Sequence, residues 1–168
     1  MTDDIHLIPF VTYLESLAED RAALAALRRG LGEAPGAAPE MYRYVVPRLP
    51  ANLPRWHEDQ YYLVASLFGL HPLAGGSGNM GHHFAQAAVD GGNEDAVAIE
   101  RRFTILLNAH ADDLPFLLRQ AISYLQSKDI PVNYHQLLGD LRWWNSERRS
   151  VQRRWANAFW GRGRTSED

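Results

Sequence analysis

The chain has 168 residues, no cysteine and a formal net charge of −3 at neutral pH. This length suits one compact domain or two small lobes, and a hydrophobic fraction of 46% is enough to form a core. The lack of cysteine excludes disulfides, thiolate metal sites and thiol nucleophiles. No apolar run approaches the ~18 residues of a membrane span, and the start Met1-Thr2-Asp3-Asp4 is acidic where a secretory signal would be basic. We therefore expect a cytoplasmic protein with no membrane partner.

The basic residues are unevenly distributed. Residues 142–164 hold seven arginines and one acid, Glu147, whereas the rest of the chain has 10 basic and 19 acidic residues. A locally basic end can attract a polyanion such as nucleic acid. Lys128 is the single lysine among the 17 basic residues, and arginine is suited to binding phosphates and stacking on bases. A GC-rich coding sequence also favours arginine, so the composition permits nucleic-acid binding without establishing it.

Helical spacing dominates the first half, and no two-residue alternation indicates a strand. The run from Tyr61 to Phe68 is too apolar for a surface helix and predicts a central buried one. Asp20 is suited to cap the second helix, and prolines 47, 50 and 54 interrupt the chain before the buried helix. The predicted helices cover residues 4–19, 20–30, 41–46, 56–70 and 82–89.

The second half is more regular. Apolar stripes predict helices over 99–107 and 114–125, one that begins after Asn133, and a last helix over 146–160. The run Asp90-Gly91-Gly92-Asn93 is the clearest boundary signal. We predict an all-α fold, a compact bundle of about nine helices. Its N-terminal lobe would cover residues 1–92, its C-terminal lobe residues 93–162, and a disordered tail residues 163–168.

Catalytic and metal-binding patterns are weak. His82 and His83 would point about 100° apart on a helix, so they cannot chelate as an i, i+4 pair does. Acid pairs such as Asp112-Asp113 lie near helix starts, where carboxylates favour the helix dipole. The stretch Gly75–Gly81 can hold a phosphate through backbone amides, but it matches no nucleotide-binding motif and a flexible loop is the default. We expect no catalytic residue, no metal and no cofactor.

Arginines beside apolar helix stripes are the candidate contacts to nucleic acid. Arg21 and Arg28 share a face, although Arg28 and Arg29 can equally serve the helix dipole at a C-terminus. On the last helix, Arg149, Arg153 and Trp160 lie opposite the buried face. That pattern is typical of a stacking platform for single strands. A Trp160 docked on another lobe or subunit explains it equally well.

Five segments carry a resemblance to a known family. They are Arg21–Leu31 (RAALAALRRGL), Tyr62–Pro72 (YLVASLFGLHP), Glu100–Leu107 (ERRFTILL), Tyr134–Trp144 (YHQLLGDLRWW) and Arg154–Ala156 (RWA). In this order they resemble the CasB-type small subunit of the type I-E CRISPR Cascade complex. The loops at 33–54 and 73–95 match no motif of that family.

The resemblance implies a non-catalytic helical subunit, present as two copies in an RNA-guided surveillance complex. Its partners would be the other Cascade subunits, a second copy of itself, the guide RNA and the target DNA backbone. Its basic surfaces would stabilise the opened target DNA. The candidate nucleic-acid-binding residues are Arg21, Arg28, Arg29, Arg101, Arg102, Arg119, Arg142, Arg149 and Arg153.

Two other interpretations remain open at this stage. A helical scaffold would use its arginines to pair with acids on neighbouring proteins and would have no direct nucleic-acid contact. A free-standing DNA-binding regulator would require the helices within 133–160 to form a helix-turn-helix.

Overall fold

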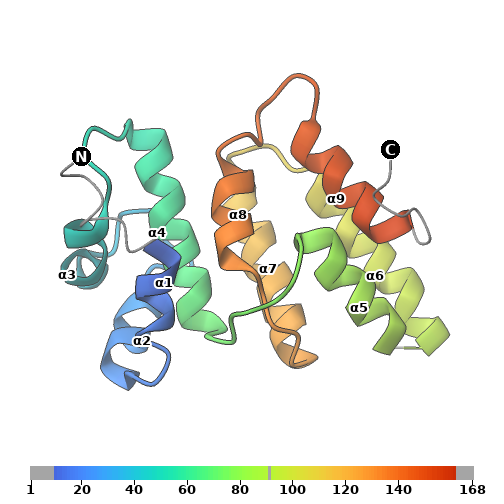
Figure 1. Ribbon diagram of the computed structural model, residues 1–168, viewed down its shortest axis with the longest axis horizontal. Helices are drawn as coiled ribbons and strands as arrows, with labels where there is room; N and C mark the ends of the chain where they lie inside the picture. Colours follow the sequence, from blue (N-terminus) through green and yellow to red (C-terminus); the bar gives the residue numbers. More distant parts are fainter. Residues whose placement is uncertain (1–9, 91, 162–168) are drawn as a thin grey trace. The chain divides into compact units, whose positions relative to one another are not determined.

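The computed structural model describes residues 10–90 and 92–161, and its regular elements are helical (Figure 1). None of these residues lies in a β-strand, which confirms the predicted all-α fold. In chain order the α-helices are α1 (Phe10–Glu15), α2 (Arg21–Arg28), α3 (Tyr42–Val45), α4 (Arg55–Leu70), α5 (Met80–Asp90), α6 (Gly92–Leu107), α7 (Leu114–Ser127), α8 (Tyr134–Leu141) and α9 (Ser150–Trp160). Two short 3-10 turns, η2 (Pro39–Met41) and η3 (Val46–Arg48), flank α3.

The chain divides into two compact units, Met1–Ala74 and Gly75–Asp168. This division lies before α5 and therefore earlier than the boundary expected near residue 92. The reason is the packing of α5 against α9 and α6 in the second unit. Gly81 permits this packing, since a Cβ there would overlap the main-chain carbonyl of Trp155. Asp90 is the last residue of α5 and Gly92 the first of α6, and both helices belong to the second unit.

The first unit is built on the predicted buried helix. Every residue of α4 from Tyr62 to Gly69 is buried. Helix α2 packs on α4 with Ala23, Leu24 and Leu27 buried. The Asp20 carboxylate accepts a hydrogen bond from the Ala23 amide at 3.0 Å, so the predicted N-cap is confirmed.

Helices α2 and α4 approach so closely that Gly69 has no room for a side chain. A Cβ at Gly69 would lie 2.9 Å from Cβ of Leu27 and 3.1 Å from the backbone nitrogen of Arg28. We predict that Gly69→Ala lowers the free energy of unfolding by about 1–3 kcal/mol, because the two helices must separate. Gly139→Ala in α8 is the control, since nothing lies within 4 Å of its Cβ position. Denaturant unfolding should show this control unchanged or stabilised by up to about 1 kcal/mol; equal effects of both substitutions would contradict the close approach.

The second unit has an aromatic core. Phe103 lies with its ring centroid 5.2 Å from that of Phe84 and 4.7 Å from that of Phe159. Trp144 packs on Trp155 with centroids 5.1 Å apart. These rings join α5, α6 and α9 to the turn that follows α8. The Asn133 side chain accepts from the Gln136 amide at 3.0 Å and caps α8 as predicted.

Several predicted boundaries differ from those observed. Helix α9 begins at Ser150 rather than at residue 146, because residues 142–149 form turns and Arg149 has a positive φ of 51°. The first helix is described only from Phe10, so its predicted part at 4–9 lies outside the described residues. The tail predicted at 163–168 also lies outside them. Among the helices of the described ranges, none combines the length and the apolar character needed to cross a bilayer.

Candidate nucleic-acid interface

Three of the candidate arginines lie together at α2. Arg21, Arg28 and Arg29 are all exposed, and Arg29 is the C-cap residue of the helix. The guanidinium of Arg28 donates to the Gly69 carbonyl at 3.2 Å, so this side chain also joins α2 to α4. Arg28 therefore has a structural role, which differs from the expected interaction with the dipole of its own helix. Arg21 and Arg29 carry the charge of this face without such a contact within the described part of the chain.

Three more candidates lie on α6 and α7 of the second unit. Arg101, Arg102 and Arg119 are exposed. The Arg102 guanidinium lies over the Tyr124 ring, 5.4 Å from its centroid, which holds α6 against α7 by a cation–π contact. Within residues 10–90 and 92–161, the side chains of Arg101 and Arg119 make no ion pair or hydrogen bond, so both remain available to an external phosphate.

The remaining candidates lie along residues 142–154. Arg142 is the C-cap residue of α8, and its guanidinium lies 5.3 Å from the centroid of the Trp143 ring. The Arg149 guanidinium donates to the Leu107 carbonyl at 2.8 Å and so links the start of α9 to the end of α6. Arg153 is exposed on α9. Arg154, which was not among the candidates, donates to buried Asp140 at 3.5 Å.

The two exposed tryptophans of the second unit differ in their surroundings. Trp160 packs against Phe103 and Phe159 with centroid distances of 5.5 and 4.8 Å. It therefore closes the core of its own unit. Trp143 is 57% exposed and was not among the predicted site residues. The sequence carried a usable signal in Trp143-Trp144, because two adjacent residues in a helical turn cannot both face the core.

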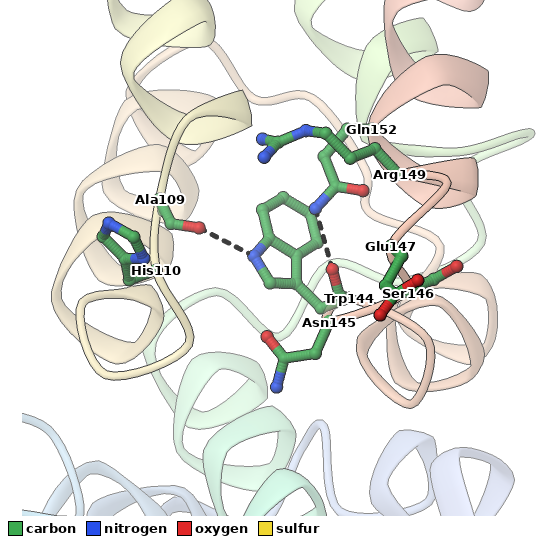
Figure 2. A pocket seen from close by; sticks show the side chains of 8 residues that line it. All are labelled: Ala109, His110, Trp144, Asn145, Ser146, Glu147, Arg149 and Gln152. Carbon is green, nitrogen blue, oxygen red and sulfur yellow. Dashed lines mark hydrogen bonds between the residues drawn. The ribbon is translucent and has the colours of Figure 1, made fainter.

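A polar pocket of about 260 Å³ lies beside this segment (Figure 2). Figure 2 shows the Trp144 indole donating from Nε1 to the Ala109 carbonyl at 2.9 Å. The Gln152 amide donates to the Trp144 carbonyl at 2.9 Å, while its oxygen is buried without a hydrogen-bond partner among the described residues. The pocket is lined by Ala109, His110, Trp144, Asn145, Ser146, Glu147, Arg149 and Gln152.

The histidines and acids do not gather into a metal site. Among the described residues, no group of three or more His, Asp or Glu side chains is placed to hold an ion. His82 is exposed and His83 buried, as their adjacency on a helix predicted. At the glycine-rich stretch, the Asn79 side chain accepts from the Gly81 amide at 2.9 Å. The Asn79 side chain therefore caps the start of α5, and the Gly81 amide is already engaged within the chain.

His83 makes the stability of the chain depend on pH. Burial and the neighbouring His82 lower its pKa to about 4, and its Nε2 accepts from the Asn133 amide at 3.0 Å, which requires the neutral ring. The unfolded chain, with a pKa near 6.5, binds the proton more readily, so stability is complete above about pH 6.5 and falls as the pH drops toward 4. We predict a loss of about 3 kcal/mol across this window in denaturant titrations. The His83→Gln substitution should remove most of the pH dependence of the free energy of unfolding between about pH 6.5 and 4. An unchanged pH dependence would contradict the role of His83.

The arrangement of α8 and α9 bears on the regulator interpretation. Residues 142–149 separate the two helices. A helix-turn-helix joins its helices by a turn of about three or four residues. The geometry therefore gives no support to a helix-turn-helix within 133–160.

Three comparisons place the chain among known proteins. A family model described as CRISPR-associated protein Cse2 matches residues 23–160. The chain is 36% identical to the CRISPR-associated protein Cse2 of Thermus thermophilus over 165 residues, covering 95% of this chain and 92% of that protein. It superposes on the crystal structure of CasB from Thermus thermophilus with a TM-score of 0.79 and 31% identity, covering 90% and 96% of the two chains.

A further similarity is to a chain in a structure of a CRISPR RNA-guided surveillance complex. The TM-score is 0.76 at 29% identity, and the match covers 92% of this chain and 91% of that one. The family-model match includes all of the five sequence segments except Arg21 and Ala22, and the Thermus thermophilus relative aligns with 95% of the chain. The chain therefore belongs to the Cse2 family, which confirms its resemblance to the CasB-type small subunits.

Proposed function

We propose that the chain is a non-catalytic small subunit of a CRISPR RNA-guided surveillance complex, in which its arginines stabilise opened target DNA. The observation that carries the proposal is the pair of exposed arginine sets, one at α2 and one over α6, α7 and residues 142–153. They would contact phosphates of the displaced strand or of the guide–target duplex without reading bases. Its partners are then the other subunits, the guide RNA and a second copy of the chain, in the cytoplasm.

Opening a duplex along a guide RNA is nearly balanced in free energy. A few contacts to the DNA backbone can therefore shift the equilibrium toward the open state. Arg21, Arg29, Arg101, Arg119 and Arg153 are suited to this role, because their side chains are exposed and have no ion pair or hydrogen bond within the described ranges. Arg28, Arg102, Arg142 and Arg149 combine such a role with contacts inside their own unit.

A scaffold function is the second candidate, and exposed apolar side chains favour it. Ile105 on α6 is 51% exposed and Phe116 on α7 is 64% exposed. A subunit that bridges other proteins would bury such residues and would pair its arginines with acids of its neighbours. This candidate predicts complex assembly without any effect of arginine substitutions on DNA opening.

Affinity purification of the tagged chain from its native host, at low salt, tests membership of such a complex. We expect a stoichiometric set of partner proteins together with a short RNA that contains repeat sequence. A second variant, Ile105→Glu with Phe116→Glu, tests the scaffold function. It should lose protein partners if these side chains lie at subunit interfaces. Purification of the unaltered chain alone, from cells that express the neighbouring genes, would contradict the proposed function.

A further inference from the structure

We propose that Trp143, with the Arg142 guanidinium over its ring, is a stacking surface for a base of single-stranded nucleic acid. This proposal rests on the proposed function and deepens it, because phosphate contacts by arginine leave the bases of an opened strand exposed to water. Trp143 is 57% exposed, although tryptophan is usually largely buried in a folded domain. More than half of the surface of this residue is therefore open to solvent.

The backbone around Trp143 holds the ring outward. The Trp143 amide donates to the Asp140 carbonyl at 3.1 Å, and the Trp144 amide donates to the Leu141 carbonyl at 3.2 Å. Trp144 is only 3% exposed and is anchored by its indole nitrogen to the Ala109 carbonyl. Because successive residues in a helical turn point about 100° apart, burial of Trp144 directs Trp143 to the surface. The ring is therefore oriented before any ligand binds.

The surroundings of Trp143 favour a polyanion. The Arg142 guanidinium lies 5.3 Å from the ring centroid and can cover at most one face of the indole. Residues 142–154 include five arginines, at 142, 148, 149, 153 and 154, and a single acid, Glu147. A base on the indole surface would thus lie beside the Arg142 guanidinium, in a segment whose net charge is positive. Aromatic rings beside arginines are how proteins bind single strands without sequence preference.

Trp56 in the first unit provides a comparison. It is 55% exposed, nearly the same as Trp143, and its ring stacks on His57 at 5.3 Å. Its charged neighbours along α4 are Arg55 and the two acids Glu58 and Asp59, so the local net charge is negative and disfavours a phosphate. Exposure alone therefore does not distinguish the two tryptophans, whereas the charge around them does.

The test uses the full chain and a single-stranded DNA of about 20 nucleotides that carries 2-aminopurine, a base whose fluorescence is quenched on stacking. We expect Trp143→Ala to weaken binding about 5- to 100-fold and to abolish the quenching. Trp143→Phe should retain most of both, because a smaller aromatic face remains. The salt dependence of binding should not change, since no charge is removed. Trp56→Ala is the matched control and should behave as the unaltered chain.

Three outcomes distinguish a failure of the stacking role of Trp143 from a failure of the proposed function. If Trp143→Ala binds and quenches like the unaltered chain, while arginine substitutions still weaken binding, the stacking role is wrong and the surface is a protein contact. If Trp143→Ala and Trp143→Phe are impaired equally with their thermal unfolding unchanged, stacking is also excluded. If the unaltered chain does not bind the oligonucleotide at low salt, the proposed function itself is contradicted and the stacking proposal falls with it.

Discussion

Replacing Asp140 by alanine is expected to lower the free energy of unfolding by about 3–5 kcal/mol. Asp140 is 3% exposed, and one carboxylate oxygen accepts from Nε1 of the fully buried Trp155 at 2.8 Å. The other carboxylate oxygen accepts from the side-chain amide of Gln136 at 2.8 Å and from the Arg154 guanidinium at 3.5 Å. Removal of the carboxylate leaves the Trp155 donor buried without a partner, which is the costly case for a hydrogen bond. Chemical denaturation followed by tryptophan fluorescence measures the loss.

Two further variants show whether the hydrogen-bond acceptors of Asp140 are responsible. Asp140→Asn keeps the shape but turns one acceptor into a donor that faces other donors, so we expect about half the loss seen with alanine. Asp112→Asn, at an exposed position, is the control and should change stability by less than about 0.5 kcal/mol. An Asp140→Ala protein as stable as the control would contradict the importance of this network.

The second large effect concerns salt. If about four phosphates of a single strand are neutralised, quadrupling the salt concentration should weaken binding roughly fifty-fold. The double substitution Arg29→Ala with Arg101→Ala removes two exposed charges that make no hydrogen bond or ion pair within the described residues. The same change in salt should then weaken the double variant only about sevenfold. Fluorescence anisotropy with single-stranded DNA of varied sequence measures both slopes, and the sequence preference should stay the same.

Arg55→Ala provides the matched control for this experiment. Arg55 is exposed at the start of α4 and lies outside the proposed surfaces. Burial raises the pKa of Asp59, and Arg55 is close enough to oppose that rise. Its substitution should leave the salt slope unchanged. A double variant that folds normally but retains the full slope would show that Arg29 and Arg101 do not contact phosphates. Arg28 is less suitable for this purpose, because its loss also removes the hydrogen bond to Gly69.

The sequence predicted most of the helices because their signals are local. The apolar run in α4 and the caps Asp20 and Asn133 depend on residues a few positions apart, and each was found as expected. The division after Ala74 was not predicted. It follows from the contact of α5 with α9, and two segments so distant in the chain leave no periodic signal. A glycine-rich turn, by contrast, resembles a domain boundary whether or not the helices beside it pack together.

The exposure of the candidate arginines could be predicted from the sequence, but their contacts with other helices could not. Exposure of all nine arginines follows from their positions beside apolar stripes. The partners of Arg102 and Arg149 could not be foreseen, because Tyr124 and the Leu107 carbonyl belong to other helices. Trp160 was considered as a stacking residue, and its contact with Phe103 of α6 could not be foreseen from its exposed position on the last helix. The adjacent pair Trp143-Trp144 indicated that one ring is exposed but not which one, because that depends on the contact of Trp144 with Trp155 of α9.

The most direct test of the central claim measures target opening by the assembled complex. Complexes that contain the unaltered chain, the Arg29→Ala/Arg101→Ala chain or no such chain would be compared by permanganate reactivity of thymines in the displaced DNA strand. We predict that opening is greatest with the unaltered chain, reduced with the double variant at equal subunit content, and lowest without the chain. Equal opening with the unaltered chain and the double variant, in complexes of identical composition, would contradict a role for these arginines and leave the scaffold function.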